Sequence, residues 1–197
     1  MPNSKPTLPA NPSIHPWRLR QAARVILGGG ILAYPTESVF GLGCDPLNPQ
    51  AVFRLLRLKQ RPVSKGLILI ASDFNQLQPF IDQLPSQQLE PVIQSWPGPH
   101  TWVLPAAPTL PFWLRGDHSG IAVRVTNHPL AAALCRASGR PLVSTSANRS
   151  NHPPARNALQ VRLCCGGEID MILHGATQGL AQPTSIRDAL TGIILRS

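Results

Sequence analysis

AVFRLLRLKQRPVSKGLILIA, residues 51–71, decides the fold because its hydrophobic pattern changes abruptly halfway along. Apolar residues recur at helical spacing over 51–59, which predicts an amphipathic helix. Residues 67–71 are apolar without interruption, which is typical of a strand buried on both faces of a sheet. A helix that leads directly into a buried strand indicates an α/β or α+β domain.

The same two patterns recur on both sides of this stretch. They predict helices over 17–27, 73–80, 86–95, 129–138 and 156–164, and strands over 31–34, 101–104, 121–125, 142–145, 171–173, 185–187 and 193–195. The glycines at 41 and 43 indicate a turn or a close backbone approach, and the Pro- and Gly-rich stretch 105–120 a loop. Because several strands follow one another without a helix, we expect a mixed sheet flanked by helices.

Length and composition favour one domain. The chain has 197 residues, of which 43% are hydrophobic, so one sizeable core is expected over residues 15–197. Residues 1–14 are rich in proline and lack the apolar region of a secretory signal, so they are expected to be a disordered tail. No apolar run approaches the ~20 residues of a membrane span. The four cysteines form no C-x-x-C pair, which argues against a zinc site and a disulfide framework. We therefore expect a cytoplasmic protein.

The charge balance favours a phosphate-rich partner. Eighteen basic residues face nine acidic ones, a net charge of +9, and only three of the basic residues are lysine. The arginine fork matches phosphate and carboxylate oxygens, so a nucleotide or a nucleic acid is indicated. A codon preference for arginine explains the excess equally well. Aromatic residues make up only 5%, which argues against a stacking platform for single strands.

Two cations flank the end of the helix over 51–59. Lys59 and Arg61 are separated by one residue, and Lys65 follows four residues later. Such a group can neutralise a triphosphate, so that a nucleophile can approach and pyrophosphate can leave. The alternative is a solvated basic helix end that interacts favourably with the helix dipole. Gly28-Gly29-Gly30 is not a P-loop, because it follows a helix and no Lys-Ser pair comes after it.

Polar residues also follow two predicted strands. Thr36, Glu37 and Ser38 come after the first, and the stretch Ser144-Thr145-Ser146-Ala147-Asn148 ends another. Strand ends are where open sheets place ligands, and hydroxyl and amide groups can bind phosphate or the water shell of a metal ion. The alternative in both cases is a polar turn that hydrogen-bonds its own backbone.

Arg124 lies inside an apolar strand, between two valines. An arginine on a half-buried strand needs an anionic partner. The sequence leaves two partners open, Glu37 or the carboxylate of a ligand.

Five segments in this order resemble the YrdC-like family, in particular its short bacterial (TsaC) branch of threonylcarbamoyl-AMP synthases. The segments are 34–43, 58–70, 96–101, 122–125 and 144–148, and the resemblance extends over 17–197. It implies a twisted mixed sheet flanked by helices around a basic central cavity. It also implies that L-threonine, bicarbonate and ATP give threonylcarbamoyl-AMP and pyrophosphate. A separate transferase complex would then use the product for N6-threonylcarbamoyladenosine (t6A) at position 37 of tRNAs that read ANN codons.

The resemblance assigns roles to ten residues. The implied catalytic set is Lys59, Arg61, Ser146 and Asn148. The residues expected to bind ATP are Arg61, Lys65, Ser144, Ser146 and Arg196. The residues expected to bind threonine are Thr36, Arg124 and Thr184. We assign no metal ligand, since Mg²⁺ is expected to arrive with ATP.

The chain departs from the long-form relatives, which carry a histidine where this chain has Ile70 and an additional C-terminal domain that is not expected here. Two alternatives to the synthase remain open: a non-catalytic module that binds double-stranded RNA or tRNA in the same basic cavity, and a nucleotide-regulated factor of the same fold. A weak affinity for RNA and no membrane partner are expected in addition.

Overall fold

The computed structural model describes residues 15–180 and 184–196, so the tail expected at 1–14 lies outside the described part. The helices are α1 (Pro16–Leu27), α2 (Pro49–Lys59), α3 (Ser86–Gln94), α4 (Phe112–Arg115), α5 (Pro129–Ser138) and α6 (Ala158–Cys165). The strands are β1 (Leu32–Pro35), β2 (Phe40–Gly43), β3 (Ile68–Ala71), β4 (His100–Pro105), β5 (Gly120–Val125), β6 (Leu142–Ser146), β7 (Met171–Ile172), β8 (Ser185–Asp188) and β9 (Ile194–Arg196). None of the described helices is long and apolar enough to cross a membrane.

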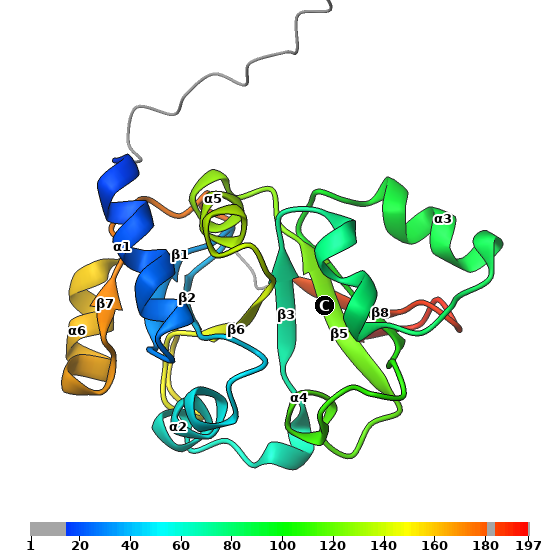
Figure 1. Ribbon diagram of the computed structural model, residues 1–197, viewed down its shortest axis with the longest axis horizontal. Coiled ribbons are helices and arrows are strands. Elements are labelled where there is room, and N and C mark those ends of the chain that lie inside the picture. Colours follow the sequence, from blue (N-terminus) through cyan, green and yellow to red (C-terminus); the bar gives the residue numbers. More distant parts are fainter. Residues whose placement is uncertain (1–14, 181–183, 197) are drawn as a thin grey trace, which may run out of the picture.

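The strands form one mixed sheet in the order β7-β1-β2-β6-β3-β5-β4-β8-β9. Three neighbouring pairs are parallel, β1 with β7, β3 with β5 and β4 with β8, and the other five pairs are antiparallel. Figure 1 shows the sheet at the centre of the molecule, with α6 at one end and α3 at the other. The expected fold class, a mixed sheet flanked by helices, is confirmed.

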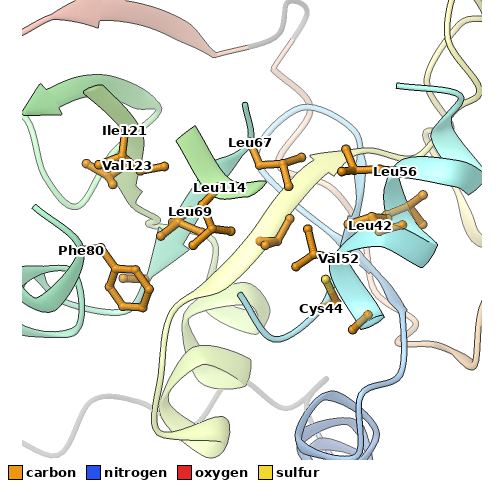
Figure 2. Packing of buried hydrophobic residues seen from close by; sticks show 14 of the residues in the cluster. Leu42, Cys44, Val52, Leu56, Leu67, Leu69, Phe80, Leu114, Ile121 and Val123 are labelled. Carbon is orange, nitrogen blue, oxygen red and sulfur yellow. The ribbon is translucent and has the colours of Figure 1, made fainter. Parts of the chain in front are cut away.

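Alternating residues of the strands serve two hydrophobic cores. Leu69 and Val143 belong to the larger core, which contains residues of α2, α3, α4 and α6. Ile70 and Leu142 belong to a smaller core with α1 and α5. This alternation is the period of two that a strand imposes, and it explains why β3 is apolar throughout. Figure 2 shows the larger core continuing from Leu42 to Val123.

Two glycines expected in a turn lie in a strand instead. Gly41 and Gly43 belong to β2, which pairs with β1 on one side and with β6 on the other. A Cβ on Gly43 would lie 2.6 Å from the carbonyl oxygen of Val143 and 2.8 Å from the ring of Tyr34. The expected turn is therefore wrong and the close approach is correct, because glycine is here a packing requirement and not a chain reversal.

The structure differs from the sequence prediction at two further places, and short helical elements explain both. The expected loop over 105–120 contains α4, whose Leu114 is fully buried, and four residues are too few to show a helical period. The helix expected over 73–80 is two 3₁₀ turns, Phe74–Gln76 and Gln78–Phe80. Asp73 caps the first of them by accepting a hydrogen bond from the backbone N–H of Gln76, as its N-cap pattern predicts.

Candidate active site

A cavity of about 940 Å³ opens on the face of the sheet that α1 and α5 cover only in part. Ile68 of β3, Ala122 of β5 and Ser144 of β6 line it, whereas Leu69 and Val123 point to the larger core on the other face. The ten residues predicted for the site all line this one cavity: Thr36, Lys59, Arg61, Lys65, Arg124, Ser144, Ser146, Asn148, Thr184 and Arg196. The expected basic central cavity is present.

The end of α2 places Lys59 and Arg61 at the cavity. Asn48 caps the first turn of α2, and the helix ends where Gln60 adopts a left-handed conformation with φ of 51°. The backbone N–H of Arg61 still returns to the carbonyl of Leu56, as in the helix endings that a left-handed residue produces. The chain thus reverses between the two cations, and both side chains reach the cavity.

The ammonium of Lys59 holds the loop that follows β6. Lys59 Nζ donates to the carbonyl oxygen of Ser146 (2.5 Å), the carbonyl oxygen of Asn148 (2.9 Å) and Asn148 Oδ1 (2.6 Å). Ser146 Oγ in turn donates to the same Oδ1 at 2.6 Å. An ammonium has three protons, and these three oxygen atoms accept them. Burial lowers the pKa of Lys59 to about 8.

Arg61 divides its guanidinium between the protein and the cavity. Nε donates to the carbonyl of Gly66 at 3.1 Å, and Nη2 donates to the carbonyls of Lys65 (3.0 Å) and Gly66 (2.8 Å). Nη1 makes no hydrogen bond to any part of the chain that the structure describes. One edge of the fork therefore fixes the turn after α2, and the other edge is left for a ligand.

Arginines near the cavity repel one another. Burial and then the charge of Arg196 lower the pKa of Arg61. Burial and then the charge of Arg124 lower the pKa of Arg196, whose Nη2 donates to the carbonyl of Thr184 at 3.0 Å. Cations that destabilise one another in this way attract a polyanion, which fits a triphosphate.

Arg124 has a protein partner and hydroxyl partners. Its Nη2 lies 3.5 Å from Glu37 Oε2, and both side chains are buried. Nη1 donates to Thr184 Oγ1 at 2.6 Å and to Thr101 Oγ1 at 3.3 Å. The sequence left Glu37 and a ligand carboxylate open as the anionic partner of Arg124, and the structure places Glu37 in that position.

Unpaired polar atoms gather beside Arg124. Among the described residues, six buried side-chain polar atoms make no hydrogen bond, and four of them belong to Tyr34, Glu37, Ser38 and Arg124. Buried polar atoms usually have partners, and two of these four residues, Ser38 and Arg124, line the cavity, as is typical of a site that a ligand completes. Thr36 differs, because its hydroxyl donates to the carbonyl of Val39 at 2.7 Å, so that it can only accept a hydrogen bond from a ligand.

Sequence reasoning missed the threonines that support Arg124 and its partner. Thr101 is fully buried in β4 and contacts Arg124, and Thr126 donates to Glu37 Oε1 at 2.5 Å. A signal was available, because each is a polar residue in or directly after an apolar strand. Its meaning depended on pairing β4 with β5, which the sequence does not show.

Comparisons with known proteins agree with this geometry. The family model named for Sua5, YciO and YrdC and described as "telomere recombination" matches residues 24–197. The chain is similar to a threonylcarbamoyl-AMP synthase of Nitrosococcus oceani, with 56% identity over 91% of this chain and 97% of that protein. A synthase of the same name from Xanthomonas campestris is 53% identical over 90% of this chain and 96% of that protein.

Solved structures show the same fold. The structure of P. abyssi Sua5 complexed with L-threonine has a TM-score of 0.84 and 34% identity. The match covers 89% of this chain and 52% of that chain, so the present chain spans about half the length of that relative. Escherichia coli YciO has a TM-score of 0.79 at 26% identity, covering 92% of this chain and 89% of that one.

Proposed function

Since the chain belongs to the Sua5, YciO and YrdC family, we propose that it is a threonylcarbamoyl-AMP synthase in which residues 15–197 act as one catalytic domain. The substrates are L-threonine, bicarbonate and ATP. The observation that carries the proposal is the cavity itself, which has a group of cations at one end and a single buried guanidinium with hydroxyl partners at the other.

ATP binds at the end that Lys59 and Arg61 form, and Arg196, which repels both Arg61 and Arg124 and donates to Thr184, extends the basic surface toward Arg124. The free edge of Arg61 and the side chain of Lys65 contact the phosphates, and the Ser144 hydroxyl donates a hydrogen bond to them. Ser146 lies beside the phosphates, with its hydroxyl proton donated to Asn148 Oδ1. The ammonium of Lys59 contributes its charge and holds Ser146 and Asn148 in place. Magnesium arrives with the nucleotide, and it would supply further charge neutralisation on the phosphates.

Threonine binds at the other end of the cavity. Its carboxylate pairs with Arg124, whose Nε makes no hydrogen bond to the described residues. Thr184 lies beside that guanidinium, and the Thr36 oxygen can accept a hydrogen bond from the substrate. An arginine surrounded by hydroxyls binds a carboxylate with defined orientation, which leaves the amine directed away from Arg124.

The reaction then needs positioning and charge neutralisation more than covalent catalysis. The neutral amine of threonine and bicarbonate form a carbamate and release water. A carbamate oxygen attacks the α-phosphorus in line, the new P–O bond forms, and the bond to the β-phosphate breaks with departure of pyrophosphate. The cations at the ATP end stabilise the charge on the leaving group, and the cavity holds both reactants at close range.

The product is a mixed anhydride, and we propose that a separate transferase complex uses it for t6A formation on tRNA in the cytoplasm. The non-catalytic RNA-binding module is not favoured, because the relatives are named as synthases and the buried Arg124 cannot reach the backbone of a duplex. A weak affinity for RNA remains compatible with the net charge of +9 and would fall steeply with added salt.

Pyrophosphate release tests the proposal. The purified protein should release pyrophosphate from ATP only when both L-threonine and bicarbonate are present. Release that does not depend on threonine would contradict the proposal. Arg61→Ala should reduce the rate by about a hundredfold or more, by analogy with the loss of a donor that stabilises developing negative charge.

A further inference from the structure

We propose that Glu37 is the positioning residue for Arg124, and that it sets the affinity of the protein for the threonine carboxylate without contacting the substrate. The inference rests on the proposed function.

Glu37 approaches the guanidinium from outside the cavity. Its neighbours Thr36 and Ser38 line the cavity, whereas Glu37 does not, and its side chain is 1% exposed. Oε1 accepts the hydrogen bond from Thr126, and Oε2 lies 3.5 Å from Arg124 Nη2. One oxygen of the carboxylate is thus anchored, and the other faces the guanidinium.

The length of this ion pair is informative. The Arg140–Asp45 and Arg54–Asp170 pairs are closed at 2.7 Å, but the Arg124–Glu37 pair is 3.5 Å long. Glu37 therefore compensates the charge of Arg124 without occupying its donors at close range. Thr101 and Thr184 hold Nη1 at the same time, so the guanidinium is oriented from one side, and its Nε has no hydrogen-bond partner among the described residues.

A charge is needed at this position for electrostatic reasons. Within the described residues, Glu37 is the one carboxylate within ion-pair distance of Arg124. The nearby Arg196 is positively charged and repels Arg124. Removing one partner of a buried ion pair leaves the other uncompensated. Burial by itself raises the pKa of Glu37, but Arg124 and the Thr126 hydrogen bond outweigh it and hold the pKa below its ordinary value. The residue is therefore ionised at neutral pH.

Steady-state kinetics of Glu37→Gln test the inference. Glutamine keeps the shape and an acceptor for Thr126 but removes the charge. We expect the KM for threonine to rise by about tenfold or more, while the KM for ATP changes by less than about twofold. Asp45→Asn is the matched control, because Asp45 is a buried carboxylate paired with Arg140 and does not line the cavity. It should leave both KM values unchanged.

The double variant shows whether Glu37 acts through Arg124. If it does, Glu37→Gln combined with Arg124→Gln should have the same threonine KM as Arg124→Gln alone, within about twofold. The inference would be overturned if the two substitutions raised the threonine KM independently, so that their factors multiplied in the double variant, or if the KM for ATP rose equally. Should Glu37→Gln fail to fold, Thr126→Val removes the anchor of Oε1, together with the acceptor for the His128 backbone N–H, and should raise the threonine KM by a smaller factor. An unchanged value would also overturn it.

This experiment separates the inference from the function on which it depends. A wild-type protein without threonine-dependent pyrophosphate release would defeat the proposed function. A wild-type protein with that activity and a Glu37→Gln variant with normal threonine KM would defeat the positioning role alone.

Discussion

At one end of the cavity, the ammonium of Lys59 donates all three of its protons to the loop after β6, whereas at the other end the guanidinium of Arg124 keeps Nε without a hydrogen-bond partner among the described residues. Both cations are buried to the same degree, at 5% exposed. They differ in what they need from a ligand. The satisfied cation organises the protein, and we propose that substrate completes the unsatisfied one.

This difference separates two ways in which a cation can matter in one site. Loss of Lys59 removes three hydrogen bonds to the loop after β6, so this loop should rearrange. Loss of Arg124 removes the proposed donor for substrate and leaves the buried carboxylate of Glu37 without its charged partner. Removing Lys59 is therefore expected to affect turnover and folding together, whereas a replacement of Arg124 that keeps its charge is expected to affect mainly threonine binding.

The largest effect should come from Lys59→Met, which keeps the length of the side chain and removes the charge and donors. We expect kcat/KM for ATP to fall by about a hundredfold to a thousandfold, together with a lower midpoint of thermal unfolding. Lys65→Met is the matched control, since Lys65 lines the same cavity but is not buried. Lys65→Met should lower kcat/KM for ATP by less than about tenfold. Equal losses for the two lysines would remove the distinction between them.

Arg124→Lys should have the next largest effect, because lysine keeps the charge but loses the fork that orients a carboxylate. The KM for threonine should rise by about thirtyfold, and the KM for ATP should stay close to that of the wild type. Initial rates at varied threonine and saturating ATP give the KM for threonine. A variant that loses ATP affinity instead would place Arg124 at the nucleotide.

The pH dependence distinguishes the two ends again. With the pKa of Lys59 at about 8, kcat/KM for ATP should fall by about tenfold per pH unit above that value, since this parameter reports the free enzyme. Unfolded lysine stays protonated to its ordinary pKa of 10.5. The unfolded chain therefore binds more protons between the two values, and this residue's contribution to the free energy of unfolding rises with pH there.

Lys59→Arg provides the control for that profile, because arginine stays charged throughout the range. Whatever activity this variant retains should not decline near pH 8. A decline that persists in Lys59→Arg would assign the titration to another group.

The smallest effect on the site is expected at Thr184. Thr184→Val removes the 2.6 Å hydrogen bond to Arg124 and should raise the threonine KM by about fivefold, the effect of about 1 kcal/mol. Thr101→Val should have a smaller effect, because its contact with Arg124 is 3.3 Å long. A reversed order would mean that Thr101, and not Thr184, orients the guanidinium.

Local patterns predicted most of the elements, and the family resemblance predicted the residues of the cavity. The apolar run that contains β3 and the helical spacing of α2 each express a short-range period, which a sequence shows directly. The strand β2 was missed because glycine has no side chain to reveal a period of two. Its role became visible only with Tyr34 and Val143 packed against Gly43.

The partnerships inside the site were beyond sequence reasoning. Lys59 and Asn148 are 89 positions apart, and so are Glu37 and Thr126. Whether a cation is satisfied by the protein or by a ligand depends on such long-range contacts. The sequence therefore predicted that Lys59 acts on phosphate, whereas the geometry indicates that it first holds a loop.

The position of β3 between β6 and β5 fixes a length within the site. Ile68 lies opposite both Ser144 and Ala122, and Ile70 lies opposite Arg124. Neighbouring strands are about 4.8 Å apart and residues along a strand about 3.3 Å apart. Ser144 and Arg124 are thus separated by two strand spacings and two residues, an interval maintained by backbone hydrogen bonds. Mutations in the surrounding loops can change affinity, but the span between the two ends of the substrate is set by the register of the sheet.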